Sequence, residues 1–137
     1  MGLIHTEITI KNTRDVFKAE EGLINEREIR QATIQAMVDT GASTLVINEE
    51  LRQQLGLAVR AERQVILANE TKVKCLLTEP VEIRWKDRDT ICKAYVIPEA
   101  GEVLLGALPL EDMDLIIDPK GQEVTGAHGD EIVLIAK

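Results

Sequence analysis

The sequence predicts a mainly β protein, and three observations lead to that prediction. Short apolar stretches alternate with turn residues roughly every eight to twelve residues, as in proteins built from many short strands. The aromatic residues are only Phe17, Trp85 and Tyr95, so the core must be built from Ile, Val and Leu. β-Branched residues favour strands. The chain has 137 residues without internal repeats, and we expect a single domain over residues 1–137.

Strands are predicted wherever apolar side chains alternate, or run together, between turn residues. These segments are residues 2–10, 27–38, 44–47, 63–68, 72–77, 81–85, 89–97, 103–105, 115–117, 122–125 and 131–136. Residues 11–15 contain turn formers. Residues 16–23 are ambiguous, because Val16 and Phe17 favour a short strand whereas the residues that follow favour a turn.

Two short helices are predicted. Asn48 is a good N-cap, Glu49 follows where a negative charge interacts favourably with the helix dipole, and Gly56 is placed where helices end. Pro109 fits the first turn of a second helix, because its missing N–H costs no hydrogen bond there.

The charge and composition exclude several classes of function. The formal net charge is −8, and nucleic acids and anionic membranes attract basic surfaces, so we expect neither as a partner. Cys75 and Cys92 lie outside any CxxC or Cys/His cluster, and His5 and His128 are the only histidines. We therefore expect two apolar cysteines, no metal and no cofactor. No signal peptide or membrane-spanning stretch is visible, which favours a soluble, cytoplasmic protein.

One stretch carries the chemistry: Ala36-Met37-Val38-Asp39-Thr40-Gly41-Ala42-Ser43-Thr44-Leu45-Val46. Apolar residues run into Asp39 and resume after Thr44, which predicts a carboxylate at a strand-to-turn corner. Such an acid is costly unless it is paired or used. Gly41 permits a sharp turn and leaves space above the carboxylate, and Ser43 can hydrogen-bond back to it. Asp39 is therefore either a catalytic aspartate or the first residue of an Asx-turn that bonds only its own backbone.

A second segment, Val103-Leu104-Leu105-Gly106, precedes the predicted helix at Pro109. An apolar stretch ending in Asp-Thr-Gly-Ala, a hairpin, and then Leu-Leu-Gly before a short helix resembles the aspartic proteases of the retroviral (retropepsin-like) type, in their stand-alone bacterial or cellular form. The resemblance covers residues 6–124. It implies a closed or bent, barrel-like β fold with one or two short helices.

The resemblance also implies an aspartic endopeptidase that acts on peptides or proteins. Such enzymes activate water between two carboxylates, and this chain has a single Asp-Thr-Gly. Asp39 would therefore meet its own copy across the two-fold axis of a homodimer. In the family, Thr40 braces the two loops, Gly41 leaves room for substrate, and Leu105-Gly106 packs beneath the loop. The alternative is a catalytically silent relative that serves as a dimerisation or peptide-binding module.

The expected site residues fall into two groups. For catalysis they are Asp39, Thr40 and Gly41, and for substrate binding they are Ala42, Ser43, Ile66, Leu67, Ala68, Asn69 and Glu70. The last five belong to the flap, the hairpin that covers the site in this family. Retroviral flaps are rich in glycine, whereas this one has none, and Asn69 tolerates a left-handed conformation better than Glu70 does. Ala107 also stands where retroviral members carry an Arg that ties the subunits together.

The end of the chain is an apolar run, Ile132-Val133-Leu134-Ile135-Ala136. A strand that is apolar on both faces must be covered on both, and a terminal strand leaves an edge open to pairing. We therefore expect residues 131–137, together with residues 2–10, at or near the two-fold interface. The alternative is that this strand completes the sheet of its own protomer.

Overall fold

The computed structural model describes residues 3–135 of the chain. Short strands connected by turns dominate them, as the sequence predicts. The elements are β1 (His5–Asn12), α1 (Thr13–Glu20), η1 (Glu26–Glu28), β2 (Gln31–Val38), β3 (Leu45–Ile47), α2 (Glu49–Leu55), β4 (Val59–Ile66), β5 (Lys72–Thr78), β6 (Val81–Trp85), β7 (Arg88–Cys92), β8 (Ala94–Val96), β9 (Leu104–Leu105), α3 (Ala107–Asp112), β10 (Leu115–Asp118) and β11 (Glu123–Gly126).

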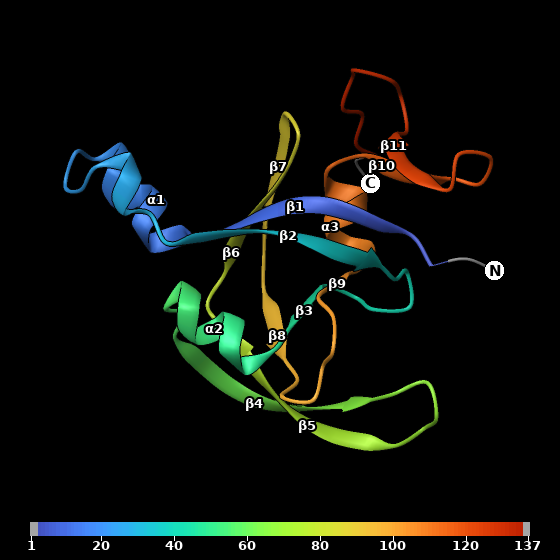
Figure 1. Ribbon diagram of the computed structural model, residues 1–137, viewed down its shortest axis with the longest axis horizontal. Helices are drawn as coiled ribbons and strands as arrows, with labels where there is room; N and C mark the ends of the chain where they lie inside the picture. Colours follow the sequence, from blue (N-terminus) through green and yellow to red (C-terminus); the bar gives the residue numbers. More distant parts are fainter. Residues whose placement is uncertain (1–2, 136–137) are drawn as a thin grey trace.

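Nine of the strands form one bent sheet in the order β4-β5-β8-β3-β9-β2-β1-β6-β7, and β10 and β11 form a separate hairpin (Figure 1). Strands β4 and β7 are the two edges of this order, so over residues 3–135 the sheet is not closed into a barrel. The mainly β, bent architecture is confirmed. The expectation that the sheet closes into a barrel is wrong. The expectation of one or two helices is also wrong, because this part of the chain contains three, α1, α2 and α3.

The middle of the sheet determines where the Asp39 loop lies. Strand β9 pairs in parallel with β2 and antiparallel with β3. Strands β2 and β3 are consecutive in the chain but are separated in the sheet by β9. Because the loop between them must cross the end of β9, a segment from far along the chain supports it.

The core consists almost entirely of Ile, Val and Leu side chains, as the scarcity of aromatic residues predicts. The most deeply buried of these are Ile8, Ile10, Leu45, Ile47, Leu55, Leu57, Val81, Ile83, Val96 and Leu105. Trp85 joins this core, and its indole N–H donates to Thr6 Oγ1 at 2.9 Å. Buried indole N–H groups need such a partner.

Helix α2 forms for the reasons given by the sequence. The Asn48 side chain accepts a hydrogen bond from the backbone N–H of Leu51 at 2.9 Å, as an N-cap does. Leu51 and Leu55 are buried on one face. Gly56 ends the helix with a φ of +64°, a conformation that costs glycine little.

Helix α1 replaces the turn and short strand expected between residues 11 and 23. Asn12 caps it by accepting from the backbone N–H of Asp15 at 3.1 Å. The Asn12 side chain also donates to the carbonyl of Leu55 at 2.9 Å, so the cap is fixed by a residue of α2. The helix is short and Phe17 remains exposed, so neither its length nor the burial of Phe17 can stabilise it. The tertiary contact with Leu55 therefore favours the helix over a turn.

Most predicted strands differ from the observed ones by a few residues at an end, and two differ in a way that has a clear structural cause. Strand β2 begins at Gln31, because residues 26–28 form a 3₁₀ turn in which the Glu28 side chain accepts from the Asn25 N–H at 3.0 Å. The strand expected over residues 89–97 is split at Lys93. Its first half pairs with β6 and its second half with β3 and β5. The Thr44 hydroxyl donates to the Lys93 carbonyl at 2.6 Å and occupies the backbone group at the break.

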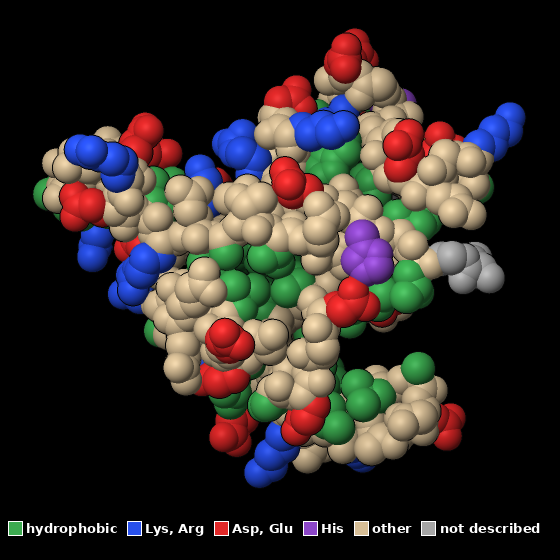
Figure 2. All heavy atoms as spheres, in the orientation of Figure 1, with side chains coloured by type: hydrophobic (Ala, Val, Ile, Leu, Met, Phe, Trp, Pro, Cys, Tyr) green, Lys and Arg blue, Asp and Glu red, His purple; other side chains and the backbone are tan. Residues whose placement is uncertain are grey.

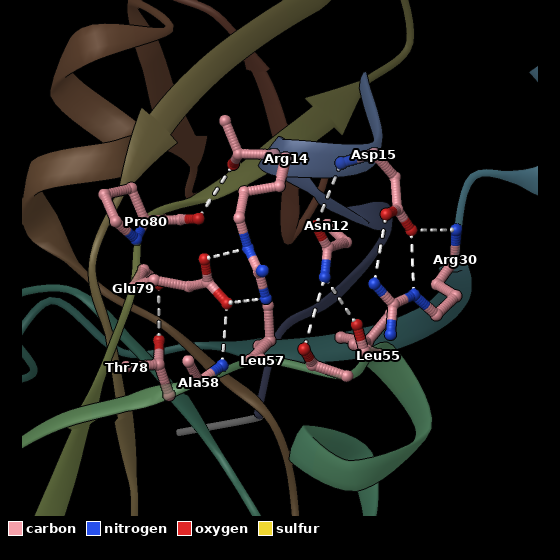
Figure 3. A network of polar contacts seen from close by, with 12 residues as sticks. Asn12, Arg14, Asp15, Arg30, Leu55, Leu57, Ala58, Thr78, Glu79 and Pro80 are labelled. Atoms are coloured by element: carbon pink, nitrogen blue, oxygen red, sulfur yellow. Dashed lines mark hydrogen bonds and ion pairs between the residues drawn. The ribbon is translucent and has the colours of Figure 1, made fainter. Parts of the chain in front are cut away.

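A network of ion pairs, in which the carboxylates are buried and the arginines are partly exposed, joins α1 to the base of the β4–β5 hairpin (Figure 3). Asp15 accepts from Arg30 Nε at 2.8 Å and Nη2 at 3.0 Å. Glu79 accepts from Arg14 Nε at 2.7 Å and from the backbone N–H of Ala58 at 2.7 Å. Burial acts to raise the pKa of Glu79, but these hydrogen bonds outweigh it and hold the pKa below its usual value. The hairpin is thus anchored at its base.

The C-terminal segment differs from the sequence prediction. Residues 131–135 form no strand, and Ala136 lies outside the described residues. The N–H of Val133 donates to the carboxylate of Asp114 at 2.9 Å rather than to a neighbouring strand. An apolar run predicts a strand covered on both faces, whereas Ile132 and Leu134 are 50% and 57% exposed. The protomer by itself therefore does not supply the cover that a buried strand requires.

Candidate active site

Asp39 lies one residue beyond the end of β2, and its backbone is held on both sides. The N–H of Val38 donates to Ile4 and the N–H of Asp39 donates to Leu105, at 2.8 and 3.0 Å. The carboxylate oxygen Oδ1 accepts from the N–H of Gly41 at 2.9 Å. This is the Asx-turn expected from the sequence. In the described part of the chain the carboxylate has no further hydrogen-bond partner, and its second oxygen is free to act on a ligand.

Two glycines allow the loop to pack this closely. A Cβ on Gly41 would lie 3.1 Å from Asp39 Oδ1, so a side chain there would crowd the carboxylate. A Cβ on Gly106 would lie 2.3 Å from the carbonyl oxygen of Thr44 and 2.5 Å from that of Ala42. No heavy atom fits at that distance. Gly106 therefore allows the start of α3 to lie against the underside of the loop, as the resemblance implies.

Helix α3 fixes the second half of the loop through its first two N–H groups. Ala107 donates to the carbonyl of Ala42 at 2.8 Å, and Leu108 donates to that of Ser43 at 2.9 Å. The Ser43 side chain is exposed, and in the described residues no hydrogen bond joins its hydroxyl to Asp39. The expectation that Ser43 supports the acid is thus wrong, because the Gly41 N–H is closer along the chain and makes that bond. Thr40 is exposed.

The predicted flap exists as the β4–β5 hairpin, which reaches away from the rest of the sheet (Figure 1). Its tip is a tight turn: Glu70 N–H donates to the Leu67 carbonyl at 2.8 Å, and Thr71 N–H donates to Asn69 Oδ1 at 3.0 Å. The left-handed residue is Glu70, with a φ of +65°, and not Asn69. Asn69 instead uses its side chain to close the turn.

Figure 2 shows the molecule hollowed between the flap hairpin and the body, with apolar side chains along the hairpin. Ile66 and Leu67, two of the expected substrate-binding residues, are 68% and 38% exposed. Ala68, Asn69 and Glu70 at the tip are exposed as well. Within residues 3–135 no hydrogen bond joins the flap to the Asp39 loop.

A second hollow, about 990 Å³, borders the Asp39 loop at Ser43 and Thr44. Ser43 and Thr44 line it, but Asp39 does not. Its other walls are α3, β10, the junction of β7 and β8, and residues 133–135. The Asp39 loop thus borders two concave regions, one beneath the flap and one beside the C-terminal segment.

An ion pair near the loop was not predicted from the sequence. His5 Nε2 lies 2.6 Å from Glu102 Oε1. Both residues are beside Met37, which pairs with His5 and whose N–H donates to the carbonyl of Val103. No local pattern indicates this pair, because its members are 97 positions apart in the sequence.

The described residues 3–135 contain neither a metal-binding cluster nor a helix that could span a membrane. There, no group of three or more His, Cys, Asp or Glu side chains is placed to hold a metal ion. None of the helices in this range has the length and apolarity to span a membrane. Cys75 is buried and Cys92 is half-buried, and both are free thiols. Burial raises the pKa of both, so neither is an activated nucleophile.

Comparison with known structures gives the class of protein. The chain is similar to EIAV protease complexed with the inhibitor HBY-793, with 18% identity and a TM-score of 0.54 over 81% of this chain and 88% of that one. It is also similar to the retroviral protease-like domain of Ddi1 from Leishmania major, with 15% identity and a TM-score of 0.61 over 100% and 96%. Together with the Asp-Thr-Gly loop, these similarities define a retropepsin-like aspartic protease fold.

The sequence comparison gives the family. Residues 24–108, well over half of the chain, match the family described as aspartyl protease. The chain therefore belongs to the aspartyl protease family. No curated protein matches it.

Proposed function

We propose that this protein is an aspartic endopeptidase whose catalytic pair consists of Asp39 from each of two copies of the chain. The observation that carries the proposal is the geometry of Asp39. One carboxylate oxygen is fixed by the Gly41 N–H at 2.9 Å, and the loop is supported by β9 and α3. An Asx-turn alone does not need this support, whereas a catalytic group must be held in place before substrate arrives.

The chemistry requires two such carboxylates. Like charges about 3 Å apart cannot both ionise, so the pair shares one proton. The ionised member takes a proton from water, which attacks the scissile carbonyl, while the protonated member donates to the carbonyl oxygen. No covalent intermediate forms. Because each chain offers one Asp-Thr-Gly, activity depends on a two-fold homodimer.

We place the dimer interface beside the C-terminal segment. The second Asp39 must come within about 3 Å of the first, so surfaces that flank the loop on that side meet the partner. The hollow next to Ser43 and Thr44 is bordered by exposed apolar side chains. They are Ile91, Leu108, Ile116, Val133, Leu134 and Ile135. A contiguous apolar surface of this kind is typical of an association site.

The substrate is then an extended peptide that lies between the flap and the loop, where Ile66 and Leu67 supply apolar contacts. A second candidate is a peptide-binding module without hydrolysis. The flap favours this alternative, because the hydrogen-bonded tip contains no glycine and has less freedom to close. Both candidates bind a peptide in the hollow beneath the flap, and they differ in whether the peptide is hydrolysed.

One variant separates these candidates. Asp39→Asn removes the ionisable group and keeps its size, so hydrolysis of a random peptide library should be abolished while the fold and the dimer remain. The matched control is Asp87→Asn, in the exposed turn between β6 and β7, which should cleave like wild type. Unchanged cleavage in Asp39→Asn would contradict the protease. Peptide binding without cleavage by the wild type would favour the silent module.

A further inference from the structure

Arg88 makes an unusual set of contacts for a buried arginine. It is 4% exposed and lies at the start of β7. Its Nη1 donates to the carbonyls of Met113 and Asp114, both at 2.9 Å. Its Nη2 donates to the carbonyls of Gly129 and Glu131. The guanidinium thus joins the end of α3 to the start of the C-terminal segment.

Asp114 holds the same segment from a second direction. Its carboxylate accepts from the N–H of Val133 at 2.9 Å and from His128 Nδ1 at 2.7 Å, and its carbonyl accepts from the N–H of Ala127 at 2.8 Å. The Val133 and His128 donors hold the pKa of this carboxyl below its usual value. Asp114 has a φ of +53°, which is uncommon for a residue with a side chain. In this conformation the carboxylate accepts from two donors and the backbone carbonyl accepts from a third.

These contacts fix a segment that has few other stabilising interactions with the rest of the protomer. Residues 132–135 are in no strand, and their apolar side chains are exposed. Terminal segments are ordinarily loose unless they are tied down. Here buried polar groups fix the backbone while the apolar side chains face outward. Apolar side chains in this arrangement are suited to contact a partner and do not pack into the core of the protomer.

The occupant of this surface follows from its position. Val133, Leu134 and Ile135 line the same hollow as Ser43 and Thr44 of the catalytic loop. The second Asp39 must approach that loop closely, so the partner nearest to the segment is another copy of the chain. Residue 107 at the start of α3 is Ala, so its side chain offers no charged group for a contact between subunits.

We infer that Arg88 and Asp114 form a clamp that holds residues 131–135 in the position from which a second copy of the chain is bound. This inference rests on the proposed dimeric protease. Arg88 and Asp114 are positioning residues: they act on association and do not touch the reacting atoms. Without the clamp, the segment must be ordered at the moment of binding, and that entropic cost weakens the dimer.

The first test uses a substitution that keeps the backbone. Asp114→Gly removes the carboxylate, and glycine adopts a positive φ without strain. The matched control is Gln122→Gly, because Gln122 also has a positive φ, +52°, but lies in the turn between β10 and β11. Sedimentation velocity over a dilution series should show the dimer dissociation constant raised at least about tenfold in Asp114→Gly and less than about twofold in the control.

The second test asks whether the effect is on association. Two copies joined by a flexible linker have an effective concentration on the order of millimolar. Peptide hydrolysis by the linked Asp114→Gly protein should therefore return to the level of the linked wild type. Arg88→Met should behave in the same way. Its control is Arg84→Met, because within residues 3–135 the Arg84 side chain pairs only with the exposed Asp89.

The outcomes separate the two proposals. Dimerisation of Asp114→Gly that equals that of Gln122→Gly would overturn the clamp. So would a linked Asp114→Gly protein that is folded by circular dichroism but inactive. A wild-type dimer without hydrolysis would contradict the protease while sedimentation still tests the clamp. A wild type that stays monomeric at all concentrations would overturn both.

Discussion

Gly106 shows how the absence of one side chain determines the packing of the Asp39 loop. Its position against the carbonyls of Ala42 and Thr44 leaves no volume for a Cβ. The loop and the start of α3 are therefore in backbone contact, and the N–H groups of Ala107 and Leu108 reach their acceptors. The same closeness fixes the distance from Leu105 to the N–H of Asp39. A larger side chain at residue 106 should therefore displace the Asp39 carboxylate.

We predict that Gly106→Ala lowers the free energy of unfolding by about 1–3 kcal/mol, as other insertions into well-packed sites do. It should also lower peptide hydrolysis by more than about tenfold, since small displacements of catalytic groups cost that much. Gly101→Ala is the control, because no atom lies within 4 Å of a Cβ placed there. Urea unfolding and peptide cleavage measure the two effects. Equal behaviour of the two variants would contradict the tight contact.

Among the elements, α1 depends most on ionised side chains. Asp15 is 4% exposed and accepts both Arg30 Nε and the Arg30 backbone N–H. The Arg30 guanidinium holds the pKa of that carboxyl below its usual value. The ionised form is therefore favoured by folding. This stabilisation is complete above the unfolded pKa of about 3.9 and is lost as pH falls through the lower folded pKa.

We predict that Asp15→Asn lowers the free energy of unfolding at pH 7 by about 1–3 kcal/mol, the range for a hydrogen bond to a charged group. The gap between wild type and variant should shrink as the pH falls below about 4, because protonation removes the same charge. Urea unfolding across pH checks this, with exposed Asp87→Asn as the control. A gap that stays constant down to pH 2 would show that the ion pair is not its cause.

The sequence predicts an element well when its signals are local. Asn48, Leu51, Leu55 and Gly56 determine α2 within one segment, and the structure confirms each role. Helix α1 was missed because its cap is fixed by Leu55, far along the chain. The strand over residues 89–97 was predicted whole, since nothing in its own pattern shows that Thr44 holds the break at Lys93.

The same rule holds for the site. The Asp39 loop is contiguous, so its residues and the Gly41 turn could be predicted from the sequence. The pairing of His5 with Glu102 and the clamp of Arg88 and Asp114 could not, because their members are brought together only by folding. The bracing role assigned to Ser43 was wrong, because a nearer backbone N–H makes the bond.

At the scale of the whole molecule, the question is whether two chains share one active site. The bent sheet and the exposed apolar residues 132–135 both bear on it. The sheet brings the Asp39 loop to an edge of the protomer where another copy can approach. The C-terminal segment beside it is held in place with its apolar side chains outward. Both features are accounted for if the catalytic unit is a dimer.

Mixing wild type with Asp39→Asn at constant total protein tests this account most directly. After full subunit exchange, random pairing at equal amounts leaves about one quarter of the dimers with two Asp39 carboxylates. The account predicts that the rate of peptide hydrolysis follows the square of the wild-type fraction, so the equal mixture retains about a quarter of the wild-type rate. A rate that falls in simple proportion to the wild-type fraction would mean that one Asp39 suffices, and would contradict the shared site.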